Sequence, residues 1–312
     1  MTDLKITPAP DSAPMGWREY LATDTITSGR QATAQRVYWG VRGFFANPLA
    51  VFGLCVILLL IIMAAFAPWI ATHDPLTQNL QRPLMPPGGE NWLGTDEFGR
   101  DIYSRIVYGS RISLYIVVLV SVIVAPIGLL IGMTAGYFGG WTDRILMRIT
   151  DIFLSFPSLI LALAFAAALG PGIENAVIAI ALTAWPPIAR LARAETLTTR
   201  AADFIAAARV SGAGSPRILL RHVLPICIPS VVVRITLNMA GIMLTAAGLG
   251  FLGLGAQPPS PEWGAMTSAG RRFMIDSWWV VTMPGMAILL VALAFNLFGD
   301  GLRDLLDPRQ SR

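Results

Sequence analysis

The sequence has 312 residues, of which 54% are hydrophobic and only 13% are charged. A soluble domain carries about 25% charged residues, so this composition indicates a membrane protein. The net charge of +4 is carried by arginine, with Lys5 as the single lysine. This excludes a Walker A loop, which needs a lysine in mid-chain, and the chain is not expected to be its own P-loop ATPase. Cys55 and Cys227 lie in apolar runs and are expected to be small core residues rather than a disulfide or metal pair.

The N-terminal region divides into two parts. Residues 1–30 contain several prolines and no clear period, which predicts a disordered cytoplasmic stretch. The polar composition of residues 1–35 predicts no cleavable signal peptide. Residues 31–45 place aromatic and branched side chains at helical spacing. They predict either an interfacial helix on the inner leaflet or a simple cytoplasmic extension of the first span.

Six segments are apolar and long enough to cross a bilayer, which takes about 20 residues. They lie near residues 49–70, 112–137, 149–169, 174–190, 226–255 and 278–299. The predicted fold class is therefore an all-α polytopic membrane protein with six transmembrane helices. The fourth segment carries Trp185-Pro186-Pro187, which predicts a kink.

The domain organisation follows from these spans. We expect an interfacial helix and the first span at 31–70, an external loop at 71–110, a transmembrane domain of five helices at 111–304 that contains a cytoplasmic loop at 199–225, and a cytoplasmic tail at 305–312.

Basic residues are divided unevenly between the two sides of this topology. With the N-terminus inside, sixteen of the 23 Lys and Arg residues fall in cytoplasmic segments and six in external ones. Cytoplasmic loops carry an excess of Lys and Arg, so both termini and the 199–225 loop are predicted to lie in the cytoplasm.

The external loop ends in a patterned segment at residues 91–111. Thr95 or Asp96 is expected to cap a helix there. The apolar residues after this cap, Ile102, Ile106 and Val107, form a stripe beside Asp101 and Arg105.

Four further polar positions lie in or near the spans. Arg148 and Asp151, three residues apart, are expected to satisfy each other at the inner interface. Arg234 lies inside the fifth span, with Asn238 four residues later on the same helical face. Because a charge in mid-membrane is costly, Arg234 is expected either to snorkel towards the cytoplasm or to line the pathway or pair with a partner subunit.

The cytoplasmic loop at 199–225 is predicted to form a short helix, a turn and a second helix. Residues 201–210 are mostly strong helix formers. The expected turn and boundary residues are Gly212 and Gly214 in the left-handed conformation, Ser215 as N-cap, Pro216 at the first helical position, and Pro225 as a breaker before the fifth span.

This loop resembles the EAA loop of the membrane permeases of bacterial ABC importers. The pattern is Ala-Ala-x-x-x-Gly, nine residues, then His-x-Leu-Pro, with Gly212, Leu224 and Pro225 among the matching positions. The resemblance implies a coupling helix that docks into a cytoplasmic ATPase, with Ala206 where the family often has Glu. The implied coupling residues are Ala206, Ala207, Ala208, Arg209, Ser211, Gly212, Arg217, Arg221 and His222. The alternative is an ordinary loop with two surface helices.

The external segment at 91–111 resembles the WLGTD-x-x-GRD-x-x-SR sequence of the C-type permease subunit of dipeptide and oligopeptide importers. The resemblance narrows the family to the peptide and nickel group and covers about residues 35–310. It implies an external cap that contacts the substrate or its binding protein through Thr95, Asp96, Arg100 and Asp101. The alternative is a structural elbow packed on the bundle. Ala246 stands where relatives often place Glu, which removes one candidate pathway residue.

The family resemblance implies a type I ABC importer permease fold in a bacterial inner membrane, with one chain forming half of the pathway for di- or oligopeptides. Nickel or another small solute is the alternative cargo. The implied partners are a homologous B-type permease, two ATPase subunits, an external substrate-binding protein and membrane lipid. ATP and Mg would bind the ATPase subunits, and we expect this chain to bind no cofactor, metal or nucleic acid.

Two other classes of function are less compatible with the residues. A secondary carrier would need intramembrane carboxylates or broken helices in two matching repeats, and no predicted span has a mid-membrane Asp or Glu. An intramembrane enzyme is disfavoured because the chain has only two histidines and contains neither HExxH nor Gly-x-Ser-x-Gly.

Overall fold

The computed structural model describes residues 29–306, which form helices and connecting loops without a β-strand. The prediction of disorder for residues 1–30 lies, apart from the first two residues of the first helix, outside this range. The helices are α2 (Gly29–Ala46), α3 (Pro48–Ala65), α4 (Ala67–Ile70), α5 (Ile102–Phe138), α6 (Gly140–Ser155), α7 (Ser158–Leu169), α8 (Ile173–Ala184), α9 (Pro186–Arg200), α10 (Asp203–Val210), α11 (Ser215–Ile218), the π-helical turn η1 (Leu219–Val223), α12 (Leu224–Phe251), α13 (Trp263–Gly270), the 3-10 turn η2 (Arg271–Phe273) and α14 (Trp279–Leu306).

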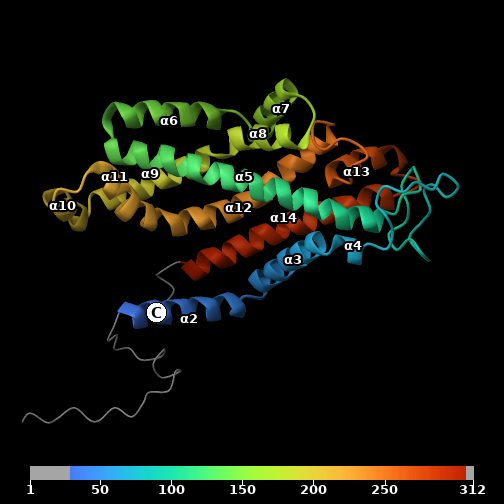
Figure 1. Ribbon diagram of the computed structural model, residues 1–312, viewed down its shortest axis with the longest axis horizontal. Coiled ribbons are helices and arrows are strands. Elements are labelled where there is room, and N and C mark those ends of the chain that lie inside the picture. Colours follow the sequence, from blue (N-terminus) through green and yellow to red (C-terminus); the bar gives the residue numbers. More distant parts are fainter. Residues whose placement is uncertain (1–28, 307–312) are drawn as a thin grey trace, which may run out of the picture.

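The long helices form an elongated bundle. Helices α5, α12 and α14 run side by side along its long axis (Figure 1). Helices α10 and α11 lie at one end, and α13 and the segment 71–101 lie at the opposite end. Five helical spans in the described residues are long and apolar enough to cross a membrane, and the bent pair α6 and α7 passes the same test when taken together. The hairpin of α10 and α11 and the segment 71–101 are therefore separated by the length of the bundle.

The third predicted span, 149–169, lies within the bent pair α6 and α7, which together pass the test for a span. Helix α6 ends at Ser155, α7 begins at Ser158, and the two are bent by 92°. Phe156 has an extended backbone, with φ −96° and ψ 143°, as expected for a residue that precedes a proline. Pro157 supplies no N–H for a continuing helix, so the chain turns at this point.

Two other spans are longer than predicted. The second begins at Ile102 instead of near 112, because Asp101 caps the helix and its first apolar residues are buried against the bundle. The fourth breaks between α8 and α9 at Trp185, as its two prolines predicted, but then continues to Arg200 rather than ending near 190. Both helices therefore carry polar first or last turns that a hydropathy pattern does not detect.

The N-terminal segment 31–45 is helical, as its spacing predicted, and is part of α2. Gly40 lies so close to α14 that an added Cβ would be 2.9 Å from the Leu305 carbonyl oxygen. Phe44 is buried, and its ring contacts Phe298 of α14 in an edge-on geometry at 5.9 Å. Most other large apolar side chains of α2 are exposed. Helix α2 is thus attached to the end of α14 along one edge.

A row of glycines brings α5 against α9. Gly128, Gly132 and Gly136 repeat every four residues and so share one helical face. A Cβ on Gly132 would collide with the Ala189 carbonyl oxygen, and a Cβ on Gly128 would lie 2.6 Å from Ile188. Small residues allow membrane helices to approach this closely. The contact between α5 and α9 therefore depends on the absence of side chains at these positions.

The small residues Ala246, Gly250 and Gly253 do not form one helix contact. Gly253 lies beyond the end of α12 with a positive φ of 78°. Gly250 faces a loop residue instead, because a Cβ there would collide with a carboxylate oxygen of Glu262. Ala246, which lies where relatives often have Glu, is buried.

We predict that Gly132→Val destabilises the protein by about 3 kcal/mol, because the new side chain collides with the α9 backbone. The matched control is Gly241→Val, which adds the same side chain to α12 at a position where a Cβ would have no neighbouring atom within 4 Å. The thermal unfolding midpoint of each purified variant is the measurement. Equal midpoints for the two variants would contradict close packing of α5 on α9.

Candidate functional site

The loop at 199–225 forms the predicted helical hairpin at one end of the bundle. Helix α10 is anchored by Ile205, and α11 is anchored by its last residue, Ile218. Both side chains are fully buried. They belong to a small apolar cluster that also contains Met133 and Tyr137 near the end of α5. The hairpin is therefore packed on the same helix that runs to the opposite end of the molecule.

Gly212 makes the turn of this hairpin, as predicted. It has a φ of +82°, a conformation that glycine adopts without strain. Its N–H donates to the Arg209 carbonyl at 2.9 Å, and the Ala213 N–H donates to the Ala208 carbonyl at 3.0 Å. These two bonds form a Schellman motif, which satisfies the last carbonyls of α10. The turn therefore depends on a left-handed residue at 212.

Four boundary predictions for the loop are wrong. Gly214 has an ordinary φ of −70° and is itself the N-cap of α11, without a side-chain bond. Ser215 is therefore the first helical residue rather than the cap, and Pro216 is the second helical residue rather than the first. One left-handed residue completes the Schellman turn, which leaves no need for a second. Pro225 does not break the chain, because the wider π-turn η1 precedes it and Pro225 lies in the first turn of α12, where its missing N–H is tolerated.

The predicted coupling residues mostly lie on the solvent side of the hairpin. Ala208 and His222 are half-buried, and the exposed members are Ala206, Ala207, Arg209, Ser211, Gly212, Arg217 and Arg221. The Arg209 guanidinium lies 5.4 Å from the centre of the Tyr137 ring, and the His222 ring lies 6.5 Å from that of Phe204. The structure thus gathers these residues on one hairpin, and their role in coupling stays a prediction.

Two apolar residues of the hairpin were not identified from the sequence. Val210 is 91% exposed and Phe204 is 48% exposed. Both are large apolar residues of α10, and this apolar character is the signal that the sequence offered. The other large apolar residue of α10, Ile205, is buried.

Ion pairs hold the neighbouring helices α6 and α9 together. Arg193 donates from Nε and Nη2 to both carboxylate oxygens of Asp143. Arg190 donates to Asp151 at 2.6 Å. The predicted pairing of Asp151 with Arg148 is therefore wrong, because the bent pair α6–α7 brings Asp151 to α9.

Arg234 and Asn238 have no contact partner in common among the described residues. Asn238 Nδ2 lies 3.4 Å from the Ala184 carbonyl oxygen at the end of α8. Arg234 is exposed and has no hydrogen bond or ion pair with any described residue. Lining of the pathway or pairing with a partner subunit by these two residues stays a prediction.

The segment 71–101 at the opposite end of the bundle is organised by buried polar residues. Asp101, rather than Thr95 or Asp96, caps α5, and its Oδ2 accepts from the Ser104 N–H at 2.8 Å and the Ser104 hydroxyl at 2.7 Å. Its Oδ1 accepts from Asn91 Nδ2 at 2.9 Å. Thr95 accepts from the Met85 N–H at 2.8 Å and donates to the Arg82 carbonyl.

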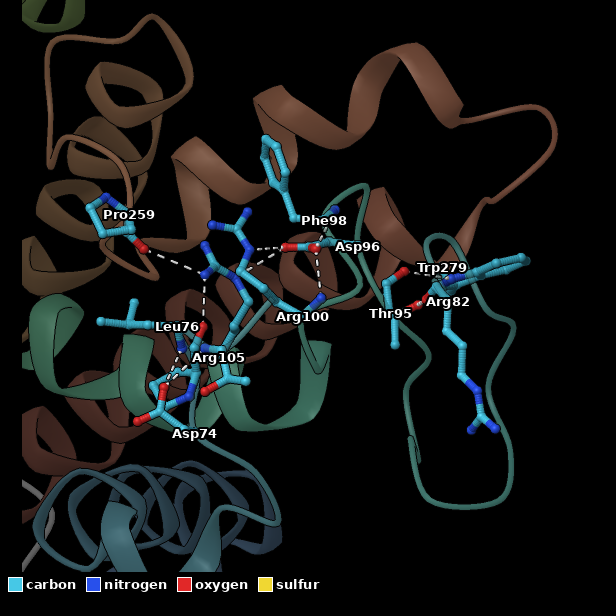
Figure 2. A network of polar contacts seen from close by, with 12 residues as sticks. Asp74, Leu76, Arg82, Thr95, Asp96, Phe98, Arg100, Arg105, Pro259 and Trp279 are labelled. Carbon is cyan, nitrogen blue, oxygen red and sulfur yellow. Dashed lines mark hydrogen bonds and ion pairs between the residues drawn. The ribbon is translucent and has the colours of Figure 1, made fainter. Parts of the chain in front are cut away.

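Asp96 and two arginines form a second buried group, shown in Figure 2. Asp96 Oδ1 accepts from the backbone N–H groups of Phe98 and Arg100, and its Oδ2 accepts from Arg100 Nε at 2.6 Å. Arg105 donates from Nη1 to the Pro75 carbonyl at 3.0 Å and lies 3.4 Å from that of Pro259. These contacts fit the structural elbow, whereas contact of this segment with a substrate or a binding protein stays a prediction.

Glu262 is a buried carboxylate that the sequence analysis missed. It caps α13 and accepts from the N–H groups of Gly264 and Ala265 at 2.8 and 2.7 Å. Burial raises the pKa of Glu262 above its ordinary value, while these two hydrogen bonds oppose the shift. No group of three or more His, Cys, Asp or Glu side chains within residues 29–306 is placed to hold a metal ion.

The comparisons with known proteins agree with this arrangement. Residues 128–312 match the family described as binding-protein-dependent transport system inner membrane component, and residues 38–87 match the N-terminal transmembrane domain of oligopeptide transport permease C. The chain belongs to this family of inner membrane transport components. It is therefore a multi-pass inner membrane protein and a permease of an ABC importer, as the two motifs predicted.

Relatives cover nearly the whole chain. The probable D,D-dipeptide transport system permease protein of Escherichia coli (strain K12) is 46% identical over 88% of this chain and 91% of its own length. The di/tripeptide transport system permease protein of Pseudomonas aeruginosa (strain UCBPP-PA14) is 46% identical over 87% of this chain and 91% of its own. The glutathione transport system permease protein of Escherichia coli O6:K15:H31 is 43% identical over 94% and 97%.

A solved structure shares the fold of this permease. A chain of the MetNI methionine ABC transporter, in an inward-facing conformation, aligns with a TM-score of 0.53 and 21% identity, over 65% of this chain and 97% of that chain. The prediction of a type I ABC importer permease fold is confirmed.

We predict that Asp101→Ala destabilises the external end of the bundle by about 3 kcal/mol, because it removes an N-cap and leaves buried donors without an acceptor. The matched control is Asp74→Ala, since Asp74 is exposed and its carboxylate accepts only from two N–H groups of its own turn. Thermal unfolding of the purified proteins measures the difference. An Asp101→Ala midpoint no lower than that of Asp74→Ala would contradict the capping role.

Proposed function

We propose that this permease forms half of the translocation pathway for short peptides in an ATP-driven importer. The relatives named above are a probable D,D-dipeptide, a di/tripeptide and a glutathione permease, which support a peptide cargo over nickel. Their alignment over more than four fifths of both chains supports the same role for the whole of this protein. The second half of the pathway would come from a homologous B-type permease.

The observation that carries the coupling mechanism is the exposed hairpin at one end of the bundle. Its Schellman turn holds the small residues Ala206 and Ala207 and the apolar Val210 outward, while Ile205 and Ile218 anchor it to the bundle. Small exposed residues let a groove on an ATPase subunit approach the backbone closely. Closure of two ATPase subunits around ATP would then move the hairpin as a lever and switch the pathway between inward-open and outward-open states.

The proposed orientation places both termini and the hairpin in the cytoplasm, with the 71–101 segment outside. The excess of basic residues in the segments on the hairpin side supports this orientation. A substrate-binding protein would deliver peptide at the external end. ATP and Mg would bind the ATPase subunits, and this chain would be non-catalytic.

We predict that Gly212→Val leaves the protein at normal abundance in the membrane but weakens co-purification of the ATPase subunits and abolishes uptake. A β-branched residue at a φ of +82° is strained by about 1–3 kcal/mol, and the turn is expected to change shape. No atom lies within 4 Å of a Cβ at this position, so the effect does not come from a clash.

Gly214→Val is the matched control, because residue 214 has an ordinary φ and its Cβ would meet only Pro216, at 4.0 Å. It should retain the ATPase subunits and transport. Ala206→Glu should be tolerated or strengthen the association mildly, if the partner groove keeps a basic residue there. Unimpaired uptake in the Gly212→Val strain would make the hairpin a simple connector and remove the coupling mechanism.

The orientation is tested by labelling single cysteines in a variant that lacks Cys55 and Cys227. A cysteine at the exposed position Glu90 should react with a membrane-impermeant thiol reagent in cells stripped of any outer barrier. A cysteine at the exposed position Ser211 should react only after permeabilisation. The reverse pattern would invert the topology and place the hairpin on the wrong side for ATP.

A further inference from the structure

Two buried arginines at the external end carry guanidinium donors for which the described residues offer no acceptor. Arg100 is 7% exposed and Arg105 is 4% exposed. A guanidinium has five N–H donors, yet Arg100 uses only Nε and Arg105 only Nη1 towards described residues. Arg105 Nε is fully buried without a hydrogen-bond partner, at 3.6 Å from Asp96 Oδ2.

The nearby carboxylate accepts its hydrogen bonds from other donors, and Arg105 Nε reaches it only as an ion pair at 3.6 Å. Asp96 accepts three hydrogen bonds, two from backbone N–H groups and one from Arg100. Glu97 lines the same region but is half-exposed, and it forms no ion pair with either arginine among the described residues. Two buried positive charges therefore share one buried carboxylate, and an incompletely paired buried charge is costly.

The arginines line a cavity of about 90 Å³. Its other walls come from the loop before α13 and from α13 itself, including Pro258, Ser260 and Ala269. A water molecule needs about 10–15 Å³ of such volume, so the cavity accommodates several waters or one small anion but not a peptide. Figure 2 shows the two guanidinium groups side by side, with Arg100 reaching Asp96 and Arg105 reaching the Pro259 carbonyl.

We propose that this cavity binds one small monovalent anion, either chloride or a free carboxylate such as formate, between Arg100 and Arg105. The anion accepts from the guanidinium nitrogens that have no protein partner and offsets the charge that Asp96 leaves uncompensated. Because Arg105 also binds carbonyl groups of two different loops, the bound anion stabilises the junction of the external segment with α13. Both arginines are too deeply buried, in too small a cavity, for a peptide to be the occupant.

The test is anion-dependent thermal unfolding of the full chain, purified with its partner subunits, as chloride replaces gluconate at constant ionic strength. A ligand that binds only the folded state raises the unfolding midpoint as its concentration rises. We expect chloride and formate to raise the midpoint of the external end by a few degrees, and broadening of the chloride NMR signal should report binding directly. Arg105→Gln should lose both effects, whereas Arg82→Gln, which removes an exposed external arginine, should keep them.

Two further variants keep the test independent of the bonds that Arg105 makes to carbonyl groups. Ala269→Met fills the cavity without changing charge and should abolish the chloride dependence while the protein remains folded. Glu97→Gln removes a negative charge from the cavity wall and should lower the half-saturating chloride concentration several-fold.

Three results would overturn the proposal. The first is a chloride effect of the same size in wild-type, Arg105→Gln and Ala269→Met proteins. The second is no response of the wild-type protein to chloride or formate. The third is stabilisation that requires Arg105 but is produced only by an added external binding protein, which would assign the arginines to a carboxylate of that partner.

Discussion

The close approach of α5 to α9 is the constraint on which both ends of the molecule depend. Helix α5 has 37 residues, a length of roughly 55 Å at 1.5 Å per residue, whereas the hydrocarbon core of a bilayer is about 30 Å thick. It therefore extends beyond the membrane core. Its first turn is capped by Asp101 in the segment 71–101, and Met133 and Tyr137 near its other end form part of the cluster under the hairpin. The glycine row at 128, 132 and 136 fixes this helix against α9.

This arrangement connects the two ends of the molecule through one continuous helix. The hairpin contributes Ile205 and Ile218 to the apolar cluster with α5, so a force on the hairpin acts directly on α5. At the other end, the residues that join α5 to the segment 71–101 are buried polar groups with specific partners. Buried polar groups resist displacement, because breaking their hydrogen bonds leaves donors or acceptors unsatisfied. Movement of the hairpin is thus expected to shift α5 as a unit.

The sequence predicted the features that depend on residues close together in the chain. Gly212 was recognisable because a glycine after a run of helix formers is typical of a Schellman turn, and Trp185-Pro186-Pro187 marked the break between α8 and α9. Positions that depend on contacts between distant residues were not predictable in this way. Asp151 was paired with a neighbour three residues away, whereas its partner Arg190 lies 39 residues further along the chain. The role of Gly132 becomes visible only once α9 lies against it.

Where several residues compete for one role, the sequence did not select among them. Thr95, Asp96 and Asp101 are all suitable N-caps, and only the path of the loop shows that Asp101 meets the free N–H of Ser104. Pro225 was expected to break the chain because the π-turn before it has no clear pattern in the sequence. Phe156-Pro157 lies within an apolar run, so its hydropathy concealed a bend of 92°.

We propose that the hairpin at α10 is the part of this permease that an ATPase subunit contacts. The most direct measurement places a photoreactive amino acid at Val210, whose side chain is 91% exposed, in cells that contain the whole importer. Irradiation should produce a cross-link from Val210 to an ATPase subunit, and the same probe at the exposed external residue Trp92 should produce none to that subunit. Absence of an ATPase cross-link from Val210 in an importer that transports normally would contradict the claim.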